Sequence, residues 1–161
     1  MPAILCVCTA NQFRSPLAAA CLLAEIQSAQ PAGLWRVESA GTWAEPGRPA
    51  ALPALEAARR LGLAGLEAHR TRPVARELLA EFDLILVMEA GQKEALSIEF
   101  PACKPRLRLL SAAAGFPPSD LPDPAWPGVN GEQVALEIQR LVRQGLPHLL
   151  GLAGQLAAAA R

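Results

Sequence analysis

The hydrophobic pattern alternates along the chain between short apolar runs and longer segments with helical spacing. Four apolar runs predict buried strands at residues 3–7, 36–40, 84–88 and 107–110. Helical spacing between them predicts helices at residues 16–27, 50–61, 75–81 and 92–97. A long final helix is expected to begin near Asn130. This alternation favours right-handed crossovers and a parallel sheet covered on both faces. We therefore predict an α/β fold, with one three-layer α/β/α domain around a central four-stranded parallel sheet.

The end of the final helical segment contains two residues that disfavour a continuous helix. Gly145 and Pro147 interrupt the pattern, and proline removes a backbone donor and clashes with the preceding turn. We therefore expect the long helix to end here and residues 146–161 to form an extra C-terminal helix. A chain of 161 residues is most simply one domain, spanning residues 1–161.

Composition restricts the classes of partner. The 15 Lys and Arg balance the 15 Asp and Glu, so no overall field favours nucleic acid or an anionic membrane. No secretory signal is visible, and the apolar stretches are too short to span a bilayer. The four cysteines show neither a Cys-x-x-Cys pair nor zinc-ligand spacing, so we expect no metal and no cofactor. These features indicate a reduced, cytoplasmic protein. We separately expect a monomer or a weak homo-oligomer, in which the C-terminal segment would make the contact.

The segment that follows the first apolar run carries the strongest chemical signal. The run ends in Cys8, Arg14 follows six positions later, and Ser15-Pro16 opens a helical segment as expected N-cap and first helical residue. Consecutive N–H groups in a tight loop at a helix N-terminus attract phosphate-like oxyanions and stabilise a thiolate. A buried cysteine is more often a small apolar residue, as we expect for Cys6. Strand, loop and helix together favour a nucleophile at Cys8 and covalent phosphoryl transfer.

The loop residues can be given chemical roles from their side chains. Cys8 would attack phosphorus, and Arg14 would hold two phosphate oxygens through its planar fork, more tightly as charge spreads in the transition state. Backbone N–H groups of residues 9–14 would complete a cradle for phosphate or another oxyanion. The hydroxyl of Ser15 can donate to the Cys8 sulfur and stabilise the thiolate as a leaving group.

Five motifs in a fixed order extend the picture beyond the loop. They are Cys8 to Arg14, Ser39-Ala-Gly-Thr42, His69-Arg-Thr-Arg72, Asp83-Leu-Ile-Leu-Val-Met88 and Asp123-Pro124. In order and approximate spacing they resemble the low-molecular-weight protein tyrosine phosphatases, including the bacterial members. The resemblance implies a phosphatase that hydrolyses phosphotyrosine in proteins through a phosphocysteine intermediate. It also implies a phosphotyrosine-containing protein as partner, for which a bacterial tyrosine kinase is a candidate.

The resemblance assigns the proton donor and the supporting residues. Asp123 matches the general acid of the family's late Asp-Pro loop, while we interpret Asp120 as a solvated loop residue. Asn11 matches the asparagine that braces the phosphate loop, and asparagine tolerates a left-handed conformation. Ser39 and His69 match the residues that hold that asparagine in place in the family.

Asp83 matches a family position at a strand start, where we expect a structural cap.

Several loop positions depart from the family pattern, although residues Thr9, Ala10, Asn11, Gln12 and Phe13 are all expected to line the substrate site. Ala10 replaces a glycine, which would cost about 1–2 kcal/mol if this position needs a positive φ. Phe13 replaces a second cysteine found in many members, so a protecting disulfide within the loop is not available. Gln12 matches neither the isoleucine of tyrosine-directed members nor the threonine of arginine-directed relatives.

Two tryptophans are candidates for the walls of an aryl slot. Trp43 follows Gly41-Thr42, and Trp126 follows Asp123-Pro124, where the family often carries a pair of aromatic residues. We expect both to contact the substrate ring, although either could instead pack against its own loop.

Three other functions remain open alongside the tyrosine phosphatase. A protein-arginine phosphatase differs only in the residues of the loop and its walls, and Gln12 leaves this choice undecided. An arsenate reductase would need resolving cysteines after the third strand, where the sequence reads Met88-Glu-Ala. A phosphate-binding regulatory module without turnover is the third alternative, suggested by the altered loop residues.

Overall fold

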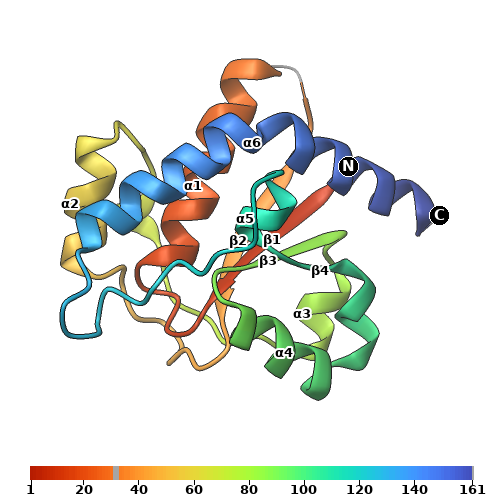
Figure 1. Ribbon diagram of the computed structural model, residues 1–161, viewed down its shortest axis with the longest axis horizontal. Helices are drawn as coiled ribbons and strands as arrows, with labels where there is room; N and C mark the ends of the chain where they lie inside the picture. The colour runs from red at the N-terminus through yellow and green to blue at the C-terminus, as the bar shows by residue number, and fades with distance from the viewer. Residues whose placement is uncertain (31–32, 161) are drawn as a thin grey trace.

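The four strands form one parallel sheet. A computed structural model describes residues 1–30 and 33–160 of the chain. The strands are β1 (Ala3–Cys8), β2 (Arg36–Gly41), β3 (Leu84–Val87) and β4 (Leu107–Leu109), and their order in the sheet is β2-β1-β3-β4. All three neighbouring pairs are parallel (Figure 1). The predicted four-stranded parallel sheet is confirmed.

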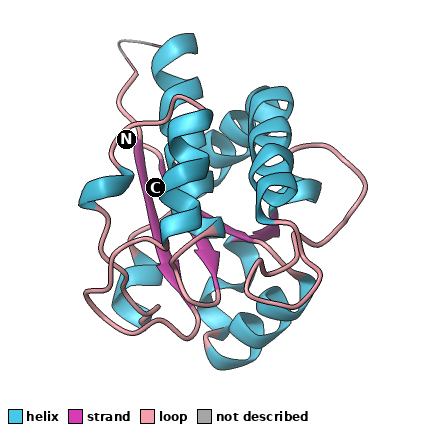
Figure 2. Ribbon diagram, turned by 90° about the vertical axis from the view of Figure 1, so that its left-hand side faces the viewer, coloured by secondary structure: helices cyan, strands magenta, loops and turns pink. Residues whose placement is uncertain are grey.

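Helices cover both faces of this sheet, as Figures 1 and 2 show. The α-helices are α1 (Arg14–Ala29), α2 (Leu52–Arg60), α3 (Arg76–Ala80), α4 (Ala90–Glu99), α5 (Leu110–Ala113) and α6 (Gly131–Ala159). Two 3₁₀ helices, η1 (Leu66–Ala68) and η2 (Pro101–Arg106), lie between them. One core cluster joins the sheet to α1, α2, α5 and α6, and the other joins it to α3, α4 and η2. The expected three layers are therefore present.

The central strand β1 carries the loop that the sequence singles out. Successive side chains of a strand alternate between the two faces of the sheet. Ile4, Cys6 and Cys8 accordingly belong to the cluster with α1 and α6, while Leu5 and Val7 belong to the other. The carboxyl end of β1 lies between those of β2 and β3, the usual position of a ligand site in such sheets.

The prediction that the final helix breaks near Pro147 is wrong. Helix α6 is continuous from Gly131 to Ala159 and includes residues 146–159 of the expected extra helix; residue 161 lies outside the described part. Pro147 is exposed, and so is Arg143, whose carbonyl loses its usual partner, so water can satisfy this group. Buried side chains before and after the proline, Leu146 and Leu149, continue one apolar face onto the domain. Tertiary packing thus outweighs the local cost of the proline.

The element ends also show structural caps. The carboxylate of Asp83 accepts a hydrogen bond from the backbone N–H of Ala3 at 2.8 Å, which joins the starts of β3 and β1. This is the capping role expected for Asp83. None of the helices in the described residues is both long and apolar enough to cross a membrane.

Candidate active site

The loop between β1 and α1 brings Cys8 and Ser15 into contact. The Cys8 sulfur lies 3.0 Å from the hydroxyl oxygen of Ser15, and both residues are buried. Helix α1 begins at Arg14 with Phe13 at the N-cap position, so the expectation that Ser15 caps the helix is wrong. The Ser15 side chain turns into the loop instead, where it meets the sulfur.

The hydrogen bonds around Ser15 allow its hydroxyl group to donate to either of two partners, depending on whether Cys8 is a thiol or a thiolate. The Asn11 amide donates to the Ser15 oxygen at 2.8 Å, and the Ala40 carbonyl lies 3.2 Å from the same oxygen. With a Cys8 thiol, Ser15 can donate to Ala40 and accept from sulfur. With a thiolate, the hydroxyl can turn and donate to sulfur, because hydroxyl hydrogens rotate freely.

Asn11 holds the loop in place through hydrogen bonds of its side chain and its carbonyl. It has a φ of 58°, the one positive φ among the described non-glycine residues. Its amide nitrogen donates to Ser39 at 2.9 Å, and its side-chain oxygen accepts from the backbone N–H of Arg72 at 3.0 Å. The ring Nε2 of His69 lies 2.7 Å from the Asn11 carbonyl, to which it donates. Burial lowers the pKa of His69. The structure therefore brings Asn11, Ser15, Ser39 and His69 together.

The guanidinium of Arg14 is buried among three oxygen partners. Its side chain is 2% exposed, and Nη1 donates to the Glu89 carboxylate and, at 2.8 Å, to the Leu121 carbonyl. Nη2 lies 3.2 Å from the Asp123 carboxylate. A buried charge needs such partners because its desolvation is costly. They also fix the plane of the guanidinium.

Glu89 is a site residue that the sequence reasoning missed. It follows β3 at the N-cap of α4, where a reciprocal capping box links it to Gln92. The amide of Gln92 also donates to the Thr9 hydroxyl at 3.1 Å, which joins the loop after β1 to α4. The available signal was a Glu-x-x-Gln pattern directly after a buried strand.

The loop that carries Asp123 is anchored from both sides. The Asp123 carboxylate accepts the backbone N–H of Ala125 at 2.9 Å, as expected for an Asp turn. Asp120 is exposed but accepts the N–H of Ala90, the first residue of α4, at 2.9 Å. Asp120 is thus a loop anchor, which corrects its interpretation as a merely solvated residue. The acidic side chain suits a helix N-terminus.

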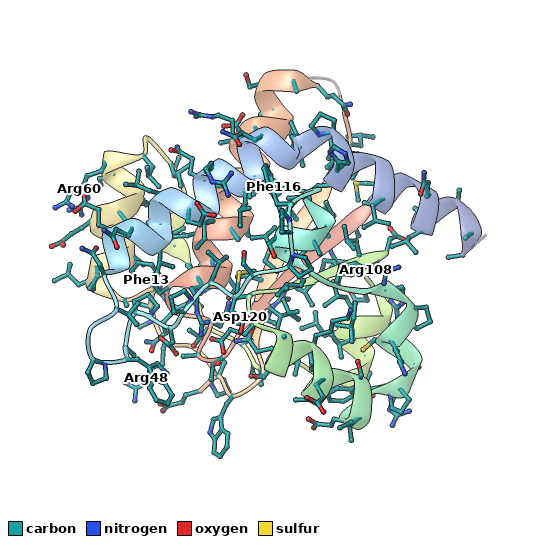
Figure 3. All side chains as sticks on the ribbon, in the orientation of Figure 1. Phe13, Arg48, Arg60, Arg108, Phe116 and Asp120 are labelled. Carbon is teal, nitrogen blue, oxygen red and sulfur yellow. The ribbon has the colours of Figure 1, made fainter. Side chains whose placement is uncertain are left out.

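A cavity of about 340 Å³ lies next to the loop that follows β1. The side chains of Cys8, Arg14 and Asp123 lie together in its wall. The remaining walls come from three segments of the chain: Ala10, Gln12, Phe13, Ala51, Pro53, Pro124, Ala125 and Gly131. Figure 3 labels Phe13 and Asp120 on the loops around the site. The phenyl ring of Phe13 packs close to Gly131, where an added Cβ would meet it at 3.3 Å.

The two tryptophans do not line this cavity. Trp43 is 86% exposed and borders a neighbouring hollow with Ala10 and Gln12, while Trp126 is 68% exposed on its turn. The expectation that they wall the aryl slot therefore differs from the structure, in which Phe13 and Pro53 take those places. A backbone hydrogen bond of 3.1 Å from Trp126 to Asp123 closes the turn that carries the indole.

The altered loop residues fit without strain. The φ of Ala10 is not positive, so its methyl group does not strain the backbone. The Gln12 carbonyl accepts from Ala51 at 2.9 Å, and its side chain reaches the Pro49 carbonyl at 3.4 Å. All four cysteines are free.

Two of the other thiols, Cys6 and Cys21, are buried in the core cluster that contains α1. Burial raises the pKa of Cys6, and it raises the pKa of Cys21 to about 12. These two thiols therefore stay protonated and unreactive near neutral pH. In the described ranges, no three His, Cys, Asp or Glu side chains gather as ligands for a metal ion.

Comparison with known proteins agrees with this geometry. The family model described as low molecular weight phosphotyrosine protein phosphatase matches residues 3–156. A low molecular weight protein-tyrosine-phosphatase of Streptomyces coelicolor is 32% identical over 145 residues, which cover 87% of this chain and 88% of that protein. A protein-arginine-phosphatase of Geobacillus stearothermophilus is 32% identical over 121 residues, which cover 75% and 77% of the two chains.

A solved structure adds chemical information. It is described as the arginine phosphatase YwlE, with serine in place of a cysteine and with the active-site serine phosphorylated. Its sequence is 30% identical to this chain, its TM-score is 0.79, and the match covers 96% of this chain and 95% of the other. Because the family model spans nearly the whole chain and these relatives align over most of their length, the chain belongs to the low molecular weight phosphotyrosine protein phosphatase family and is a hydrolase.

Proposed function

We propose that the protein hydrolyses phosphotyrosine in proteins, with Cys8 as nucleophile, Arg14 as phosphate clamp and Asp123 as general acid and base. The observation that carries this proposal is one cavity in which these three side chains meet between mostly apolar walls. Such walls suit an aryl ring, while the polar end receives the phosphate. A thiolate nucleophile also needs a reducing compartment, so we place the enzyme in the cytoplasm.

In the first step, phosphate would bind to the loop N–H groups and to the Nε–Nη2 edge of Arg14. It would compete with Asp123 for Nη2, which is 3.2 Å from that carboxylate in the structure. Asp123, once protonated, would face the leaving oxygen. The sulfur–phosphorus bond forms, the phosphorus–aryl oxygen bond breaks, and the proton of Asp123 passes to the phenolate.

In the second step, Asp123 would take a proton from water as that water attacks the phosphocysteine. The new phosphorus–oxygen bond forms while the sulfur–phosphorus bond breaks and leaves a thiolate. Ser15, 3.0 Å from the sulfur, would donate its hydroxyl proton to this thiolate in a hydrogen bond. The phosphorylated active-site serine in the related arginine phosphatase supports a covalent intermediate at this position.

A protein-arginine phosphatase is the second candidate, and the relatives named as arginine phosphatases favour it. A phosphoarginine substrate would bring a guanidinium into the cavity, where Asp123 is the one carboxylate among the lining residues. The apolar walls offer this polar group few partners, so the aryl substrate fits better. The cavity does not identify the protein that carries the phosphotyrosine, because contacts outside the cavity would select it. A tyrosine kinase is a candidate for this protein.

The decisive experiment measures hydrolysis of phosphotyrosine and phosphoarginine peptides side by side. We expect preference for phosphotyrosine, with loss of turnover in Cys8→Ser and a marked drop in Asp123→Ala. Cys103→Ser, which removes a buried thiol in η2, is the matched control and should stay active. Preference for phosphoarginine would select the second candidate, and full activity of Cys8→Ser would overturn the mechanism.

A further inference from the structure

A second cavity lies behind the phosphate loop. Its volume is about 390 Å³, and it shares no lining residue with the catalytic cavity. One wall is the outer face of α1, another is β2, and the third is the segment from Ala64 to Arg72. The volume falls within the range of small-molecule sites.

The wall of this cavity contains the residues that hold Asn11. Ser39 accepts from the Asn11 side chain at 2.9 Å, Arg72 donates its backbone N–H to it at 3.0 Å, and His69 contacts its carbonyl at 2.7 Å. All three also line the cavity. Asn11 has the left-handed φ of 58° that shapes the catalytic loop. A ligand in this cavity would therefore touch the supports of the loop without touching the loop's catalytic face.

The chemistry of the wall favours an anion with an apolar body. Leu23, Val37 and Leu66 give an apolar floor. Arg72 is neutralised by Glu38 and also donates to the Ser39 carbonyl at 2.9 Å.

Arg70 supplies the unbalanced charge. Its guanidinium donates to the His69 carbonyl at 2.7 Å and has no carboxylate partner within the described part of the chain. It is exposed at the rim of the cavity, where a carboxylate, sulfonate or phosphate could pair with it.

We propose that this second cavity is a regulatory site for a small organic anion with an apolar body. Occupancy shifts the residues that hold Asn11 and so changes the affinity of the phosphate loop for oxyanions. Because such coupling is reciprocal, phosphate in the catalytic cavity changes the affinity of the second cavity by the same factor. The proposal concerns binding alone, so it stands or falls independently of the phosphatase reaction.

The test uses 1-anilinonaphthalene-8-sulfonate as a fluorescent anionic probe, titrated at increasing concentrations of inorganic phosphate. We expect one bound probe whose apparent Kd changes with phosphate and then reaches a plateau. A Kd that rises without limit means that the probe competes for the catalytic cavity, which overturns the proposal. A Kd that is independent of phosphate overturns the coupling.

Two exposed arginines give a matched pair of variants. Arg70→Glu reverses the charge at the cavity rim and should raise the probe Kd about tenfold, because the new carboxylate repels the sulfonate that the guanidinium attracts. Arg76→Glu reverses the same charge on α3, away from this cavity, and should leave the Kd unchanged. Equal effects of the two variants would overturn the site.

Discussion

At the scale of single residues, the site depends on how a buried guanidinium is held. Arg14 is fixed by Glu89 at the start of α4 and by the Leu121 carbonyl and Asp123, which both lie in the loop before α6. Of these, Asp123 faces the cavity, and Glu89 acts through Arg14 as a positioning residue. The orientation of the fork is therefore set before any phosphate arrives.

The first prediction follows from this contact. Glu89→Gln keeps an oxygen acceptor but removes the negative charge, so we expect kcat/KM for an aryl phosphate to fall about tenfold, with weaker phosphate binding. Glu94→Gln, an exposed change on the same helix, is the control and should have no effect. Equal activity of both variants would show that Arg14 does not depend on Glu89.

The second prediction concerns His69 and pH. Burial lowers the pKa of His69 in the folded protein below the ordinary value of about 6.5 in the unfolded chain. Its contribution to stability is then complete above that ordinary value and is lost as pH falls through the folded value. We expect the free energy of unfolding to decrease from pH 7 to pH 5 less steeply in His69→Gln than in the wild type. Denaturant unfolding at several pH values measures this, and identical slopes would contradict it.

At the scale of elements, α6 shows how packing decides the course of a helix. Gly145 is buried against Ala114, and an added Cβ would lie 2.6 Å from the Ala114 carbonyl oxygen. The glycine therefore permits close approach of α6 to α5. Gly151 lies further along the same helix with open space around it. The two glycines have the same helical context but different surroundings.

The third prediction uses this pair. Gly145→Ala should lower the free energy of unfolding by about 1–3 kcal/mol, because the methyl group overlaps a packed backbone. Gly151→Ala should raise it by up to about 1 kcal/mol, because alanine is the better helix former. Urea unfolding of both variants checks the opposite signs. Stabilisation by both changes would mean that α6 can move away from Ala114.

At the scale of the whole molecule, the site joins segments that are distant in sequence. The loop after β1, the N-terminus of α4 and the loop before α6 meet through Arg14, Thr9 and Asp120. A ligand that binds there should stabilise the entire fold, because it binds the native state and not the unfolded chain.

The fourth prediction is that inorganic phosphate raises the Tm. At a concentration 100 times its Kd, phosphate should add about 2.7 kcal/mol to the free energy of unfolding. Cys8→Ser should keep this increase, because the N–H groups and Arg14 remain. Arg14→Lys should lose most of it, because lysine lacks the planar fork. An equal shift in Arg14→Lys, measured by thermal unfolding, would show that phosphate binds elsewhere.

Some features of the fold follow from residues that are close together in the sequence. The four strands, the sheet they form and the loop from Cys8 to Arg14 could be predicted, because apolar periodicity and turn chemistry act over a few residues. The left-handed conformation of Asn11 could also be expected from its position in the motif. These features depend on neighbours in the chain.

Other features were decided by contacts between distant segments. Glu89 is 75 positions from Arg14, and nothing near Glu89 in the sequence indicates that they form an ion pair. Pro147 and Gly145 favour a helix break locally, but burial of the apolar face of α6 outweighs that preference.

The residues that line the catalytic cavity also depend on contacts between distant segments. Trp43 and Trp126 lie next to the right motifs in the sequence, yet they point into solvent, and Phe13 and Pro53 line the cavity instead. The sheet and the loop from Cys8 to Arg14 follow from local sequence, because backbone preferences and hydrophobic periodicity act over a few residues. The partners of Arg14, the course of α6 and the shape of both cavities were decided by the tertiary structure, because they depend on which surfaces meet after the chain has packed.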